Sequence, residues 1–259
     1  MDCKEKLALY KKDSLKVFED GDYKHKGLVL KKDYILPMDE LNKNIMIDKN
    51  SYKFATKSLI ILSKNFNGLP IKIRLHRYWY HLNSSQILTL NYFYGFLNNI
   101  EKLNQLLKFF EICETAIDAT LEYRINEKSE IDVAIKLENG KFVYIEIKYS
   151  EHYFGTATYK NTDYASRKEN HYSLVNISLK NFKKHYQFVR NIVLGVEGNY
   201  SVFLVPKFNK SIINNYYRSI DTVSNADKFN TRLKYWEDLL SIIKNDQVNE
   251  KYFLDVTKC

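Results

Sequence analysis

The stretch SEIDVAIKLENGKFVYIEIK, residues 129–148, has the pattern of two strands joined by a turn, and the length of that turn decides which side chains share a face. A two-residue turn would pair Glu138 with Lys141 and would mix charged and aliphatic side chains on both faces. A three-residue loop over 138–140 ends in a glycine, as the left-handed position of such a loop requires, and pairs Leu137 with Lys141. We predict the three-residue loop, because only this register separates a core face from a polar face.

In the predicted register one face of the hairpin is wholly aliphatic. Its residues are Ile131, Val133, Ile135, Leu137, Val143, Ile145 and Ile147. On the opposite face Asp132 lies across from Glu146, with Cβ atoms about 4.5–5.5 Å apart, and Lys148 follows on the same strand. We therefore expect a buried aliphatic layer on one side and two acids with a lysine on the other.

This combination of side chains suits metal-assisted phosphodiester hydrolysis. Two close carboxylates repel each other, and the pKa of one of them rises unless a cation binds between them. Carboxylate oxygens are preferred ligands of Mg²⁺, and Mn²⁺ accepts the same ligands. A lysine beside them, here Lys148, can orient or deprotonate water, or stabilise charge in the transition state. The alternative is a solvent-facing hairpin with ordinary Glu–Lys pairing.

The composition indicates an ordered, basic protein. The 259 residues are 45% hydrophobic and 15% aromatic, which is enough for a substantial core. Lysine and arginine exceed the acids by 40 − 31 = +9, which favours a polyanionic partner, nucleic acid before anionic membrane. The alternative is a lysine-rich composition without such a partner.

The cysteines and the apolar runs indicate the compartment. Cys3, Cys113 and Cys259 are far apart and form no CxxC pair, which argues against a disulfide framework or a zinc ribbon. No segment has the roughly 20 apolar residues of a membrane span, and the first residues do not resemble a signal peptide. We expect a soluble, cytoplasmic protein with no membrane partner.

The flanking segments predict an α/β fold, a mixed central sheet flanked by helices. Helical periodicity covers 83–111 and 178–195, and we also predict a final helix over 231–245. Strand patterns cover 119–126 and 200–208. The order is helix, three strands, helix, strand, helix. We divide the chain into an N-terminal extension, 1–80, and a core, 81–259.

The acids and lysine carry a resemblance. Glu-Ile-Asp, 13 residues, and then Glu-Ile-Lys resembles the motif of the PD-(D/E)xK nuclease superfamily, whose restriction endonuclease-like core has the order αβββαβ. The resemblance implies catalytic roles for Asp132, Glu146 and Lys148, with Asp132 and Glu146 binding Mg²⁺. Ile131 stands where the motif usually has proline.

A second resemblance lies upstream. LHRYWYHLNSSQILTLNYF, residues 75–93, is similar to a His-x-His-Leu-x-Ser-Ser-Gln segment of a bacterial family of restriction endonuclease-like proteins. That resemblance implies a supporting role for Glu122 on the first core strand. Gln86 either caps its helix or points at the acid face of the hairpin. We interpret His76 and His81 as structural.

Polar residues after the hairpin are further candidates. Gln187 and Arg190 share a helix face and either support the site or are solvated. The irregular stretch 152–173 interleaves basic and aromatic residues, so it is either a nucleic-acid contact or a surface loop. The candidate nucleic-acid-binding residues are Lys160, Arg167, Lys168 and, on the following helix, Lys183.

The hypothesis that follows is a Mg²⁺-dependent DNA endonuclease of a bacterial type II restriction or defence system. The resemblance implies that such an enzyme works as a homodimer. A non-cleaving nucleic-acid-binding module of the same fold, and a nuclease directed at repair intermediates or RNA, remain alternatives.

Overall fold

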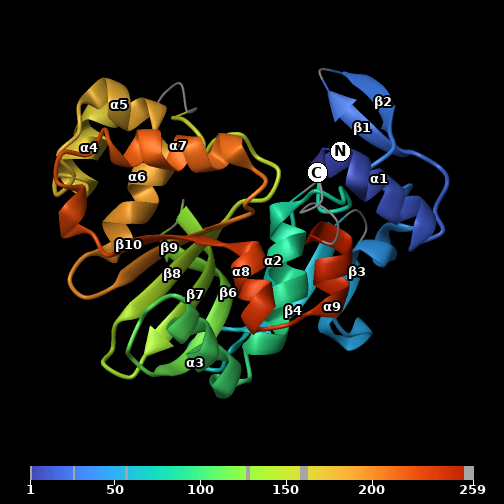
Figure 1. Ribbon diagram of the computed structural model, residues 1–259, viewed down its shortest axis with the longest axis horizontal. Coiled ribbons are helices and arrows are strands. Elements are labelled where there is room, and N and C mark those ends of the chain that lie inside the picture. The colour runs from blue at the N-terminus through green and yellow to red at the C-terminus, as the bar shows by residue number, and fades with distance from the viewer. Residues whose placement is uncertain are drawn as a thin grey trace.

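A computed structural model shows a mixed five-stranded sheet with helices on both faces (Figure 1). It describes residues 2–25, 27–55, 58–76, 78–126, 129–157 and 163–253. The strand order is β10-β9-β8-β7-β6. The strands are β6 (Ala116–Asn126), β7 (Ser129–Leu137), β8 (Phe142–Ile147), β9 (Tyr200–Val205) and β10 (Thr231–Tyr235). Strands β6 to β8 pair antiparallel and β8 to β10 pair parallel, so the predicted mixed α/β architecture is confirmed.

The register of the β7–β8 hairpin is the predicted one. Val133 pairs with Ile145, and the amide of Leu137 donates to the carbonyl of Lys141 at 2.8 Å. The loop therefore has three residues, and Gly140 takes the left-handed conformation with φ +79°.

The two faces of the sheet pack into separate clusters. The aliphatic face of the hairpin is buried against α2 (Ser85–Phe93), α3 (Ile100–Phe109) and α8 (Trp236–Ile242). Six of the seven predicted aliphatic residues belong to this core, and Ile131 is buried outside it. The second cluster covers Phe203 of β9. It is formed by the region of α4 (Tyr164–His171), α5 (Leu179–Lys184), α6 (Tyr186–Ile192) and α7 (Lys210–Ile220).

The predicted helices 83–111 and 178–195 are interrupted. The first divides at a 3₁₀ turn, Tyr94–Phe96, and α3 then starts afresh with Asn99 as its cap, whose side chain accepts from the amide of Lys102 at 3.0 Å. The second divides at His185, whose ring bonds the hydroxyl of Ser219 at 2.7 Å. Local periodicity continues across both breaks, so it did not reveal them.

The prediction of one helix over 231–245 is wrong in its first third. Thr231–Tyr235 forms β10, which pairs parallel with β9. Leu233 and Tyr235 pack against the second cluster, as alternate residues of a strand do. The helix α8 begins only at Trp236.

The first 80 residues contribute to the same core as the sheet. They comprise α1 (Cys3–Asp13), the hairpin β1 (Gly21–His25) and β2 (Leu28–Lys32), short 3₁₀ turns (Leu41–Asn44, Lys49–Ser51), and a second sheet of β3 (Tyr52–Ala55), β4 (Ser58–Lys64) and β5 (Pro70–Arg74). Leu7, Leu36, Leu59 and Ile73 belong to the first cluster.

The chain continues after α8 with a short helix, α9 (Asp246–Val248), and a π-helical turn, Asn249–Phe253. The side chain of Ser14, just after α1, donates to Glu250 at 2.7 Å, so this last segment lies against the first helix. Within the described ranges, no helix has the length and apolar character needed to cross a membrane.

Candidate active site

Three acids lie at one level across three neighbouring strands. The pairs Leu121–Val133 and Val133–Ile145 align β6, β7 and β8. One step further along each strand come Glu122, Asp132 and Glu146, which we call the acid row. Lys148 lies at the Glu146 end of the acid row, with its Nζ 2.7 Å from Oε1 of Glu146. The structure therefore brings together the predicted catalytic residues and adds Glu122 to them.

Asp132 sits where the two strands of the hairpin part. The β7–β8 pairing ends at Val133 and Ile145. Beyond it, Oδ2 of Asp132 accepts the amide hydrogen of Ile147 at 2.6 Å, in the place of a backbone carbonyl. This bond fixes the orientation of the carboxylate and satisfies an amide that the ladder leaves open.

Glu122 is held in a strained backbone conformation. Its φ is +47°, in the left-handed region that a glutamate rarely adopts and that costs on the order of 1–3 kcal/mol. Its Oε1 accepts a hydrogen bond from Nε2 of Gln86 at 2.9 Å. Gln86 accepts in turn from the amide of His76 at 3.0 Å. Of the two roles predicted for Gln86, it takes the one that points to the acids, and Ser84 caps the helix instead.

The start of α2 is fastened to the segment that follows Lys148. Asn83 donates to the hydroxyl of Ser150 at 2.9 Å, and the hydroxyl of Ser85 donates to Glu151 Oε1 at 2.6 Å. The other oxygen of Glu151 accepts the amide hydrogen of Tyr149 at 2.7 Å. Glu151 was not among the predicted residues, although it lies only three positions after Lys148. Its partner Ser85, 66 residues away in sequence, is what identifies it.

Burial and mutual repulsion perturb the pKa values of the row. Burial, and then the charge of Glu146, raise the pKa of Asp132 well above its usual value. Burial raises the pKa of Glu122 to about 7, although the bond from Gln86 opposes the shift. Burial alone would lower the pKa of Lys148, but the carboxylates around it, first that of Glu146, hold the pKa above its ordinary value. Lys148 is therefore an ammonium ion at neutral pH, and one cation faces several acids.

A divalent cation would suit this excess of acid. In the described part of the chain, no three His, Cys, Asp or Glu side chains are arranged to hold a metal ion. Two carboxylates with water and a phosphate oxygen are nevertheless a usual set of ligands for Mg²⁺. Asp132 and Glu146 supply that donor chemistry, and the raised pKa of Asp132 beside Glu146 indicates repulsion that a bound cation would relieve.

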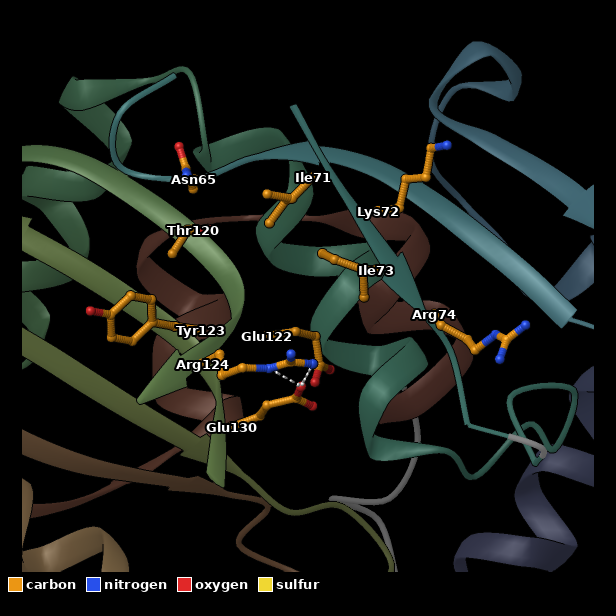
Figure 2. A pocket seen from close by; sticks show the side chains of 10 residues that line it. All are labelled: Asn65, Ile71, Lys72, Ile73, Arg74, Thr120, Glu122, Tyr123, Arg124 and Glu130. Atoms are coloured by element: carbon orange, nitrogen blue, oxygen red, sulfur yellow. Dashed lines mark hydrogen bonds and ion pairs between the residues drawn. The ribbon is translucent and has the colours of Figure 1, made fainter. Parts of the chain in front are cut away.

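A cavity of about 590 Å³ opens beside Glu122, between β5 and β6 (Figure 2). Figure 2 shows Ile71 and Ile73 pointing toward β6, and Arg124 paired with Glu130, whose atoms are 2.9 Å apart. The remaining lining residues are Asn65, Lys72, Arg74, Thr120 and Tyr123. Glu122 can thus be approached from this side of the sheet.

Gln187 and Arg190 contact other residues than the three acids in the part of the chain that the structure describes. Oε1 of Gln187 packs against Gly155, 2.7 Å from where a Cβ would stand. Arg190 reaches the carbonyl of Glu130 at 3.5 Å, two residues before Asp132. In the described ranges neither side chain bonds to an acid of the row.

Three of the four predicted nucleic-acid-binding residues lie on helices beyond the site. Arg167 of α4 covers the ring of Tyr186 at 5.7 Å, Lys168 is half-buried on α4, and Lys183 is exposed on α5. Lys160 lies outside the described residues. The structure therefore places Arg167, Lys168 and Lys183 on a helical layer, not in the acid row.

Comparison with known proteins gives a family. A protein-family model described as "REase-ARP: Restriction Endonuclease associating with ARP" matches residues 4–255. A search of curated proteins found no match.

Proposed function

We propose a nuclease function for this chain, which belongs to the family described as Restriction Endonuclease associating with ARP. The proposed activity is hydrolysis of DNA phosphodiester bonds in a bacterial defence system, of the type II restriction kind, by a PD-(D/E)xK site. The observation that carries the proposal is the acid row, closed by Lys148 at 2.7 Å from Glu146. Mg²⁺ or Mn²⁺ would be held by Asp132 and Glu146.

Each residue of the site has a separate task in this proposal. The bound ion would supply a more acidic water and would neutralise charge on the phosphate. Asp132 is held in position by the amide of Ile147, and Glu146 by Lys148. Because its pKa is raised, Lys148 acts as a charged donor that stabilises the developing negative charge, rather than as the base that takes a proton from water.

Glu122 is the group suited to proton transfer. Its pKa of about 7 lets it accept a proton near neutral pH and release it again. The hydrogen bond from Gln86 aims its carboxylate, and the cavity beside it gives water access. Glu122 would thus supply the deprotonation of water, one of the roles that the sequence left open for Lys148.

DNA as the substrate is supported by the family description and by the net charge of +9. The same description names an association with ARP, and we extend that association to this chain. Cutting both strands would call for two sites, so we propose that the chain acts as a homodimer.

Plasmid cleavage tests the proposal. Native protein, Glu146→Ala and the loop variant Glu138→Ala are incubated with supercoiled DNA in Mg²⁺, in Mn²⁺ and in EDTA. Cleavage should require the metal and should fall by at least about 100-fold in Glu146→Ala, whereas the exposed loop variant should cut like the native protein. If native protein and Glu146→Ala both bind DNA but are equally inert, the chain is a non-cleaving binding module. A matched panel of RNA and branched DNA tests the choice of substrate.

A further inference from the structure

The β1–β2 hairpin projects from the body of the protein and exposes apolar side chains along the first half of β2. Figure 1 shows it at one upper corner of the molecule, beside α1. Leu28, Val29 and Leu30 are 64%, 56% and 42% exposed. Three consecutive apolar residues at this exposure are costly in water unless they contact a partner.

The base of the hairpin is anchored to α1 by hydrogen bonds, and we call the hairpin the arm. Lys11 of α1 is fully buried, and its Nζ donates to the carbonyl of Glu19 at 2.8 Å, to Asp20 at 3.1 Å and to the carbonyl of Ile35 at 3.3 Å. These acceptors lie just before β1 and just after β2. Gly21 fits against the same point, since a Cβ there would lie 2.3 Å from the carbonyl oxygen of Leu36.

The exposed apolar residues lie on both faces of the ribbon. Leu30 pairs with Tyr23 and Val29 pairs with Lys24, so Leu30 and Val29 point to opposite sides. A protein partner that covered one face would leave the other in water. A groove encloses both faces of a two-stranded ribbon, so this pattern favours a groove.

The charge of the arm favours a groove in nucleic acid. Residues 21–32 carry four lysines and one aspartate, 4 − 1 = +3. Lys24 and Lys31 are exposed, and Lys31 also pairs with Asp22 at 2.7 Å. Lysines beside apolar tips can contact phosphates while the tips contact base edges, thymine methyl groups or an opened base step.

We propose that the β1–β2 hairpin is a DNA-binding arm that enters a groove of the duplex, with Lys24 and Lys31 on the phosphates and Leu28, Val29 and Leu30 against the bases. The major groove, about 12 Å wide, admits a two-stranded ribbon. This inference rests on the proposed function for its substrate, duplex DNA.

The arm is connected to the acid row. The hydroxyl of Tyr80 contacts the carbonyl of Asp22 at 3.4 Å, and the rings of Tyr23 and His81 lie 5.8 Å apart. His81 precedes by five residues Gln86, which holds Glu122. Figure 1 shows the arm on one side of α2 and the helices α4 to α7 on the other. The arm thus contacts the segment that leads into α2 and Gln86.

Equilibrium binding tests the arm without cleavage. Fluorescence anisotropy of a labelled duplex is measured in EDTA at several salt concentrations. Lys24→Ala should reduce the slope of log K against log salt by about 1, as loss of one phosphate contact does. The triple variant Leu28→Ser/Val29→Ser/Leu30→Ser should weaken binding by about tenfold with the slope unchanged.

Matched controls remove the same kind of side chain elsewhere. Lys12→Ala removes an exposed lysine of α1, and Leu69→Ser/Ile242→Ser removes two side chains that are each 59% exposed. These variants should bind within about twofold of native protein. Hairpin variants that bind like the controls would overturn the inference.

Further measurements identify the partner of the arm and distinguish a failure of this inference from a failure of the proposed nuclease function. In hydroxyl-radical footprints, the triple variant should lose protection only at the two symmetry-related positions where the arms of the proposed dimer enter the groove. If instead it dissociates a dimer in sedimentation and leaves the footprint unchanged, the arm binds a second copy of the chain and the inference is wrong. If binding depends on the arm but native protein cleaves no DNA, the arm stands and the proposed function falls.

Discussion

Replacing Glu122 with glutamine should flatten the dependence of folding stability on pH. Folding raises the pKa of Glu122 from 4.5 to about 7, chiefly by burial. Between these values the folded state binds more protons than the unfolded state, so the free energy of unfolding falls as pH rises through this window. The favourable contribution is fully present below pH 4.5 and is lost as pH rises past about 7.

The size of the effect follows from the shift. A difference from 4.5 to about 7 corresponds to at most about 3 kcal/mol, and coupling of Glu122 to Glu130 and Glu146 reduces what one substitution recovers. We expect native protein to lose about 1–3 kcal/mol more than Glu122→Gln between pH 5 and pH 8. Glutamine can still accept the bond from Gln86 through its amide oxygen, so the fold is retained.

Urea unfolding in EDTA at pH 5, 6, 7 and 8 measures this difference. The control is Glu138→Gln, which removes the charge of an exposed loop glutamate and should follow the native pH dependence. If native protein and Glu122→Gln lose the same stability over this range, or if native protein alone gains stability with rising pH relative to the variant, the account of the buried acid row is refuted.

Two further substitutions test local features. Gln86→Ala removes the hydrogen-bond donor to Glu122 and should lower the free energy of unfolding, measured by urea titration, by about 2 kcal/mol. The control Gln105→Ala, on the exposed side of α3, should change this free energy by no more than about 0.5 kcal/mol. Gly140→Ala places a Cβ on a residue in the left-handed conformation, φ +79°, and should lower the melting temperature, which corresponds to a loss of about 1–2 kcal/mol of stability. Gly95→Ala is the control, because Gly95 has no positive φ and open space around it, and it should leave the melting temperature unchanged. Equal losses within either pair would contradict the corresponding reasoning.

The hairpin could be predicted because its information is local. The alternation of apolar and polar residues and the glycine at 140 determine the register, and the register alone puts Asp132 opposite Glu146. The PD-(D/E)xK motif then directed attention to Lys148, and the resemblance of the upstream segment to Glu122. These are the residues that the structure brings together.

The remaining features depend on contacts between distant segments. Residues 231–235 suit a helix or a strand, and only pairing with β9 decides for the strand. The place of Glu151 beside the site depends on its hydrogen bond with Ser85. The burial of Lys11 depends on the acceptors around the base of the β1–β2 hairpin, such as the carbonyl of Glu19. The left-handed φ of Glu122 likewise has no local sequence signal, because glycine is the residue expected there.

The central claim is that Asp132 and Glu146 of the acid row bind the divalent ion on which cleavage depends. Isothermal titration of Mn²⁺ into native protein, Asp132→Asn and Glu138→Gln tests it directly. We predict saturable binding to native protein and to Glu138→Gln, and none to Asp132→Asn, which keeps the fold through an acceptor for the amide of Ile147. Binding to Asp132→Asn with the native affinity and stoichiometry would contradict the claim.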